Sequence, residues 1–280
     1  MKKLIITAAL VATATSLALA QNPAAPKPKN TEVIIDGVAG FQDTPLQPDG
    51  KWHVHDPARP QSPVVTPGSS FSQQARPPSD ATVLFDGKDL SHWRDKRSGG
   101  AAQWRIEDGV MVSAKGDIET TNSFGDIQLH LEFREPVPAR GEGQGRGNSG
   151  VYFMGLYEVQ ILDCYEAKTY ADGATGAIYG QHPALANACR PPGEWQTYDI
   201  IFTAPRFAAD GQVASPAFVT VTLNGVVVQN HQAYRGASNW KSTGKYSAHA
   251  AELPLALQYH NNSVSFRNIW VRPVPLVNEP

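Results

Sequence analysis

The chain has 280 residues, of which 18% are charged, and its formal net charge at pH 7 is −2. A protein that binds nucleic acid or an anionic membrane surface through its charge needs a basic face. This charge balance therefore disfavours both kinds of partner, and it favours a neutral or weakly charged ligand.

The first twenty residues are typical of an export signal. Two lysines precede an apolar run from Leu4 to Leu19, and residues 18–20 have the small-x-small form that signal peptidase accepts. We therefore expect residues 1–20 to be a signal peptide and the mature protein to be exported, either periplasmic or secreted. No later apolar run has the length that a membrane-spanning helix needs.

The two cysteines, Cys164 and Cys189, leave two alternatives open. Outside the cytoplasm two cysteines that come together usually pair, so a disulfide is one expectation. Two separately buried thiols are the other. A zinc site is disfavoured, because the cysteines are far apart in the sequence and form no CxxC motif.

Residues 21–80 are rich in proline and have few regularly spaced apolar residues. Long parts of this segment cannot form a helix or a ladder, because proline lacks the backbone donor. The stretches FQDTP and KWHVHDP are nevertheless too aromatic for a disordered tether. We expect a surface strap that docks on the main domain, in which His53, His55 and Asp56 are either metal ligands or ordinary polar residues of a docked loop.

Residues 81–275 are predicted to form the folded domain, followed by a tail at 276–280. Short alternating segments recur, and no stretch after the signal peptide has a sustained helical period. Hairpins are predicted at Asp108-Gly109 and Asn224-Gly225, and a last one across Asn261-Asn262. The fold class is therefore all-β, and a two-sheet antiparallel sandwich is the economical architecture.

The central stretch NSGVYFMGLYEVQILDCYE predicts a hairpin that turns at Gly155. Glu158 and Gln160 share one face of its second strand, while the apolar residues between and after them face the core. Strict alternation would put Asp163 on the core side, where an unpaired carboxylate is costly. Either a β-bulge returns Asp163 to the polar face, or Asp163 ends the strand and caps the following turn.

Three other predicted strands have the same division into an apolar and a polar face. We expect all the polar faces to converge on one concave sheet, so that one hollow gathers His130, Glu132, Arg134, Gln258, His260 and Arg267. Simpler interpretations stay open: Glu132 forms only an ion pair on a solvated face, and His260 lies in a turn. Tyr179 is a candidate for stacking on a ring of the ligand or for packing in the core or rim.

A series of segments in order from Leu84 to Arg272 resembles one known family. The segments are LFDGKDLSHW, WRIEDGVMV, LHLEFR, GNSGVYFMG, YEVQILD, TGAIYG, PPGEWQTYDI, VTLNGV and LALQYHNNSVSFRNIWVR. The chain looks like a 3-keto-disaccharide hydrolase domain, a family first filed as a domain of unknown function, within the concanavalin A-like lectin/glucanase superfamily. It departs from the family pattern at Asn261, where a glycine is usual.

This resemblance implies a concanavalin A-like jelly roll and cleavage of a sugar whose C3 hydroxyl is oxidised to a ketone. We assign Glu158, Asp163 and His260 as candidate acids and bases on this chemistry. The candidate substrate-binding residues are Glu132, Arg134, Gln160, Tyr179, Gln258 and Arg267. A divalent ion, calcium or manganese, suits such oxygen-rich ligands. The alternatives are a non-catalytic glycan-binding module and an ordinary glucanase-like hydrolase, which needs two carboxyls about 5 Å apart.

Overall fold

The structure is a computed structural model, and it describes residues 31–69 and 72–274. The predicted signal peptide, residues 1–20, and the predicted tail, residues 276–280, lie outside these ranges. Within the described ranges no helix has the length and apolarity needed to cross a bilayer.

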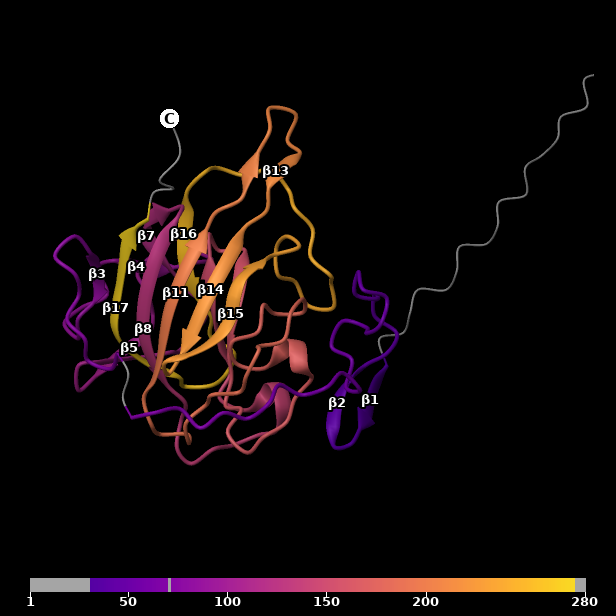
Figure 1. Ribbon diagram of the computed structural model, residues 1–280. Coiled ribbons are helices and arrows are strands. Elements are labelled where there is room, and N and C mark those ends of the chain that lie inside the picture. The colour runs from indigo at the N-terminus through magenta and orange to yellow at the C-terminus, as the bar shows by residue number, and fades with distance from the viewer. Residues whose placement is uncertain (1–30, 70–71, 275–280) are drawn as a thin grey trace, which may run out of the picture.

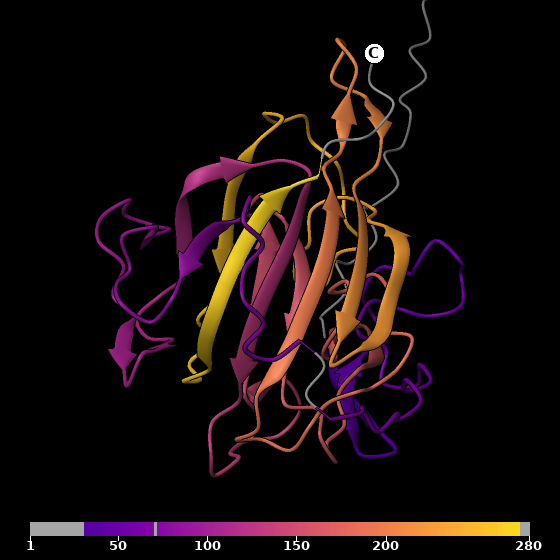
Figure 2. The same ribbon diagram turned by 60° about the vertical axis from the view of Figure 1, so that its left-hand side comes forward.

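The described chain is a two-layer antiparallel β-sandwich (Figures 1 and 2), which confirms the predicted fold class. One sheet has five strands in the order β10 (Tyr157–Ile161), β9 (Ser149–Phe153), β16 (Leu253–Leu257), β7 (Ile118–Phe124) and β4 (Trp93–Asp95). The other sheet has β15 (Val226–Ala233), β14 (Phe218–Leu223), β11 (Gln196–Thr203), β8 (Ile127–Arg134), β17 (Ser265–Pro273), β6 (Val110–Val112) and β5 (Arg105–Glu107), with β3 (Thr82–Phe85) paired to β17.

Smaller elements decorate the sandwich. Two short ladders pair β1 (Glu32–Ile35) with β2 (Val38–Phe41) and β12 (Arg206–Phe207) with β13 (Val213–Ser215). The described helical turns are the 3₁₀ segments η1 (Gly143–Gly145) and η2 (Ala171–Gly173). η1 lies in the connection before the β9–β10 hairpin, and η2 lies in the connection after it.

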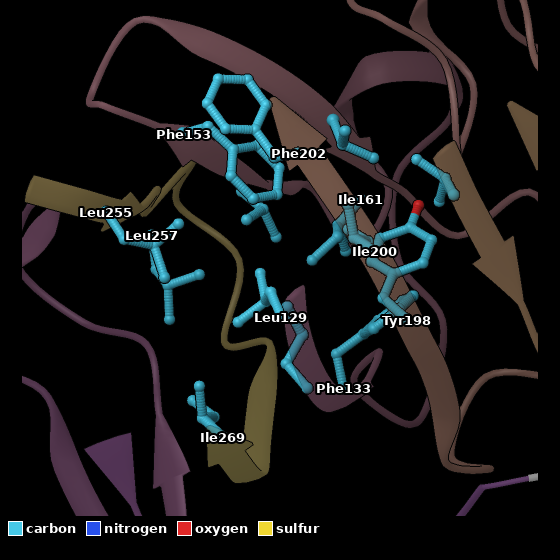
Figure 3. Close-up of a cluster of buried hydrophobic side chains, with 14 of the residues drawn as sticks. Leu129, Phe133, Phe153, Ile161, Tyr198, Ile200, Phe202, Leu255, Leu257 and Ile269 are labelled. Atoms are coloured by element: carbon cyan, nitrogen blue, oxygen red, sulfur yellow. The ribbon is translucent and has the colours of Figure 1, made fainter. Parts of the chain in front are cut away.

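The core lies between the two sheets and follows from the alternation of apolar residues. Leu129 and Phe133 of β8 point inward from one sheet, and Val159 and Ile161 of β10 point inward from the other. Figure 3 shows side chains from both sheets meeting in this layer. Burying each large aliphatic or aromatic side chain stabilises the fold by about 1.5–3 kcal/mol, so the strands are oriented by their apolar faces.

Three of the predicted hairpins are confirmed. β9 and β10 pair across the turn that contains Gly155. β5 and β6 pair across Asp108-Gly109, and β14 and β15 pair across Asn224-Gly225. All four turn residues have positive φ, between 50° and 84°. A type I′ turn requires this conformation, which Asn, Asp and Gly adopt most readily.

The predicted hairpin across Asn261-Asn262 is wrong. β16 belongs to the five-stranded sheet and β17 to the eight-stranded sheet, so the connection between them crosses from one layer to the other. Both strands have an apolar and a polar face, and that pattern is the same for a hairpin and for a crossover. As a consequence, the polar residues after β16 and those on β17 lie on opposite sides of the sandwich.

The N-terminal segment lies along the sandwich from residue 31 onward. Gln47 donates to the carbonyl of Gly180 at 2.8 Å, and Val65 donates its amide to the carbonyl of Asn187 at 2.9 Å. In Figure 1 the indigo β1–β2 hairpin stands beside the loops that follow β10. These contacts bring residues far apart in the sequence to one end of the five-stranded sheet.

Candidate functional site

A polar cavity of about 330 Å³ lies on the face of the five-stranded sheet that points away from the core. It is bounded below by β9 and β10 and at the sides by four connections. The lining residues are Gln144, Asn148, Tyr152, Glu158, Gln160, Tyr170, Tyr179, Ser238, Asn239, Trp240, Gln258 and His260. Among these described lining residues, Glu158 is the only carboxylate.

Glu158 is a buried acid whose side chain is 2% exposed. Burial raises the pKa of Glu158 to about 8, and the negative charge of Asp117 acts in the same direction. A hydrogen bond from the Tyr152 hydroxyl acts in the opposite direction but does not offset the burial. Such a carboxyl changes its protonation state near neutral pH, which suits proton transfer.

Two amide side chains present unused acceptors beside Glu158. Gln160 donates to the side-chain carbonyl of Gln144 at 3.1 Å, and Asn148 donates to the backbone carbonyl of Gln144 at 2.7 Å. These donations orient both amides and leave Gln160 Oε1 and Asn148 Oδ1 buried without a hydrogen-bond partner in the described structure. Buried acceptors normally have a donor, so these oxygens are suited to ligand hydroxyls.

Aromatic side chains form one wall and the rim of the cavity. The hydroxyls of Tyr170 and Tyr179 lie 3.0 Å apart, and the ring of Tyr170 stacks on His55 with centroids separated by 4.1 Å. Trp240 stands at the rim with 66% of its surface exposed. Flat rings beside polar groups are the usual way in which a protein surface combines apolar contact with hydrogen bonding.

Five residues that the sequence singled out are brought together here. Glu158 and Gln160 lie on the floor, Tyr179 on the wall, and Gln258 and His260 follow the end of β16. The Gln258 side chain donates to the Tyr152 hydroxyl at 3.1 Å. His260 is exposed at the edge.

Four other candidates lie on the eight-stranded sheet, so the expected convergence on one hollow is wrong. His130 lies there with Nδ1 2.7 Å from Asp199 Oδ1. The other three are Glu132, Arg134 and Arg267. Arg267 Nε is 2.7 Å from Glu132 Oε2, and both guanidinium groups contact the ring of Trp195 at 4.1 and 4.6 Å. Alternation shows which side chains leave the core, but not from which of the two sheets they leave it. These three residues therefore form an ion pair and a stacked cluster on the outer face of the eight-stranded sheet.

Asp163 does not reach the cavity either, and the predicted β-bulge is wrong. The pairing of β10 with β9 runs without a register shift as far as Ile161. Beyond the strand, Asp163 Oδ2 accepts from Arg146 Nε at 2.7 Å, and its Oδ1 accepts from the backbone amide of Tyr165 at 3.2 Å. Asp163 thus caps the turn that follows the strand, and Arg146 neutralises it.

The two cysteines are free and buried in the structure, so the expected disulfide is not formed. Their thiols are nevertheless neighbours, since a hydrogen bond between them lowers the pKa of Cys164. The alternative of two separately buried thiols is therefore correct in that both are free and buried, and wrong in that they are separate.

No group of three or more His, Cys, Asp or Glu side chains in residues 31–69 and 72–274 could hold a metal ion. The cavity offers one carboxylate and two free amide oxygens, fewer ligands than the six to eight oxygens calcium normally takes. These residues do not form a calcium site by themselves, and dependence on calcium or manganese stays a prediction. In the strap, His55 Nδ1 lies 3.3 Å from Asp172 Oδ1, which makes it a polar residue of a docked loop.

Sequence patterns did not find several of the lining residues. Asn148 directly precedes β9, while Tyr170 and Trp240 lie in long connections without strand periodicity. His55, behind the tyrosine wall, comes from a segment more than 100 residues before Tyr170. Residue spacing in the sequence does not connect these positions, because only folding brings them next to each other.

The fold and the site define a β-sandwich protein with a polar small-molecule cavity, in which a buried carboxyl, free carbonyl acceptors and aromatic walls come together. Residues 80–272 match the model of the 3-keto-alpha-glucoside-1,2-lyase-like domain, and the chain belongs to this family.

Solved structures agree with this assignment. A candidate glycosyl hydrolase from Parabacteroides distasonis ATCC 8503 is 49% identical, with a TM-score of 0.70 over 77% of this chain and 93% of that one. A second candidate glycosyl hydrolase from the same organism is 22% identical, with a TM-score of 0.52 over 70% of this chain and 94% of that one, and it shows the shared fold. No curated protein matches the sequence. The family and its relative support a carbohydrate-active function.

Proposed function

We propose that the protein is an exported enzyme that cleaves the glycosidic bond of 3-keto-glycosides by elimination, with hydrolysis as the net result if water then adds. The observation that carries the proposal is the single buried carboxyl of the cavity, Glu158, whose pKa lies at about 8. Membership of the 3-keto-alpha-glucoside-1,2-lyase-like family supports the substrate class.

The chemistry requires a base that removes the proton from C2 of the sugar. A ketone at C3 makes the proton on C2 acidic, so that Glu158 in its ionised form can remove it. The electron pair left on C2 forms an enolate with its charge on the C3 oxygen. When the ketone re-forms, a double bond develops between C1 and C2, and the C1–oxygen bond breaks with its electron pair leaving on the departing alcohol.

Several lining residues are suited to other parts of this reaction. Gln160 Oε1 and Asn148 Oδ1 can accept hydrogen bonds from sugar hydroxyls, which would hold the ring above Glu158. Tyrosine hydroxyls and the Gln258 amide supply donors for the enolate oxygen. His260, at the edge, is placed to return a proton to the leaving alcohol.

Ordinary retaining hydrolysis fits the geometry less well. That reaction needs a second carboxyl about 5 Å from the first, one acting as nucleophile and the other as acid. Asp163, the candidate for this role, is held by Arg146 and does not line the cavity. A mechanism with one carboxylate base therefore accounts for the described residues better.

Substitution of the base tests the proposal. In a Glu158→Gln variant, turnover of 3-keto-glycosides should fall about 10²–10⁴-fold, the usual contribution of a general base, while binding of the sugar persists. A Glu252→Gln variant, which changes an exposed carboxylate outside the cavity, is the matched control and should retain activity. Turnover is measured on 3-keto-glycosides and on their unoxidised parents.

Each contrary result has a defined meaning. If the parent protein converts only the unoxidised glycoside, the enzyme is an ordinary glycan hydrolase. Absence of turnover, together with sugar binding that survives Glu158→Gln and His260→Ala, would identify a glycan-binding module instead.

A further inference from the structure

Trp240 is an exposed residue that two neighbouring side chains hold in place. The residue is 66% exposed at the rim of the cavity, and isolated exposed hydrophobic side chains are common on proteins. Trp240, however, is held from two directions. Phe41 packs against it edge-on with centroids 6.2 Å apart, and Lys241 Nζ lies 4.0 Å from its centroid and 3.5 Å from that of Phe41.

The support comes from the N-terminal extension, outside the residues that match the family. Phe41 ends β2, and its amide donates to the carbonyl of His55 at 2.8 Å. A Cβ at Gly40 would overlap that same carbonyl, so the two segments approach each other as closely as glycine permits. The extension therefore joins the tyrosine wall, through His55, to the rim at Trp240.

The cavity is small for a ligand site. Its volume of about 330 Å³ lies at the lower end of the range for small-molecule sites, roughly 300–1,000 Å³. Glu158 and Gln160 are buried on its floor, so the ring that loses its C2 proton must sit deep. The group attached to C1 then extends toward the rim, where Trp240 lies beside Ser238 and Asn239.

We propose that Trp240, supported by Phe41 and Lys241, is a second subsite that binds the leaving-group sugar of a disaccharide. This inference rests on the proposed function and specifies its substrate: a glycoside whose leaving group is itself a sugar ring. The apolar C–H face of a pyranose packs on the indole, and Asn239 and Ser238 supply polar groups for its hydroxyls. The N-terminal extension thereby supports, through Phe41, a subsite whose sugar-contacting residues lie within residues 80–272.

A pair of substrates tests this subsite. For a 3-keto-disaccharide, kcat/KM should fall about tenfold in Trp240→Ala, the effect of losing one aromatic contact, while Trp240→Phe keeps most of it. For the matched methyl 3-keto-glycoside, both variants should equal the parent, because no second ring reaches Trp240. Phe41→Ala should cause a smaller loss on the disaccharide alone. The control is Ile34→Ala, which changes an exposed side chain of β1.

The result that overturns the inference differs from the result that overturns the proposed function. Equal losses on both substrates, or no loss on either, remove the second subsite while leaving the enzyme intact. If the parent converts neither substrate, calorimetric binding decides: tighter binding of the disaccharide than of the methyl glycoside, lost in Trp240→Ala, supports the subsite, and equal or absent binding removes it.

Discussion

The pKa values of two buried glutamates, Glu158 and Glu132, are shifted in opposite directions. Glu158 and Glu132 both leave the core on strands whose neighbouring residues are apolar and buried. Burial raises the pKa of Glu158 to about 8. Burial also acts to raise that of Glu132, but hydrogen bonds from three side chains and one backbone amide lower it to about 2. The hydrogen-bond partners of a carboxyl, and not its residue type or its face of the strand, therefore decide whether it can act as a base.

The acidity of Glu158 predicts the direction of the pH dependence. A base must be ionised, so kcat/KM for a 3-keto-glycoside should rise about tenfold for each pH unit below about 8 and level off above it. Glu158→Gln should lack this ionisation and show a low, flat profile. Rates measured between pH 5 and pH 10 check the expectation, and a parent profile without an ionisation between pH 7 and pH 9 would contradict it.

At the scale of the element, the β9–β10 hairpin makes room for the base through one glycine. Gly150 pairs with Gln160, and a Cβ at Gly150 would overlap Glu158 Oε1 and press on the ring of Tyr152 at 3.0 Å. The structure shows that the absence of a side chain at Gly150 lets the carboxylate lie over the neighbouring strand.

A Gly150→Ala variant should therefore lose activity mainly by displacing Glu158. A shift of about 1 Å at a catalytic group can cost about 10²-fold in rate, so we expect a loss of this order in kcat. Gly68→Ala is the control, because a Cβ there meets nothing within 4 Å. Circular dichroism would establish that the variant is folded. Full activity in folded Gly150→Ala would show that the carboxylate is not constrained by this strand.

At the scale of the whole molecule, the sandwich separates two polar clusters that the sequence could not separate. The cavity with Glu158 lies outside the five-stranded sheet, and the cluster of Glu132, Arg267 and Trp195 lies outside the eight-stranded sheet. The hydrophobic core stands between them. We therefore expect residues of the second cluster to contribute to stability and not to the chemistry of the cavity.

Arg267→Ala should lower the free energy of unfolding by about 2–4 kcal/mol, because it leaves the buried Glu132 carboxylate without its ion-pair partner. The kcat/KM for a 3-keto-glycoside should remain at the parent value. Denaturant unfolding and steady-state kinetics on the same preparation check both expectations. An activity loss without a loss of stability would connect this cluster to the site.

Much of the fold could be predicted from local patterns. Alternation in β8 and β10 identified the core residues, and Asp108-Gly109 and Asn224-Gly225 identified two turns, because backbone sterics and burial act over a few residues. Alternation also found four residues of the cavity, which are Glu158, Gln160, Gln258 and His260. These patterns could not find Trp240 or His55, which lie in irregular connections.

The sequence by itself determined that the chain is all-β, which side chains of each strand face the core, and that it resembles one family. Only the tertiary structure decided that β16 and β17 belong to different sheets, that Arg267 and Glu158 never meet, and that Phe41 supports Trp240. The reason is physical. Strand periodicity and turn conformation depend on neighbours in the chain, whereas sheet partners, burial of a carboxyl and its pKa depend on residues that folding brings together from far apart.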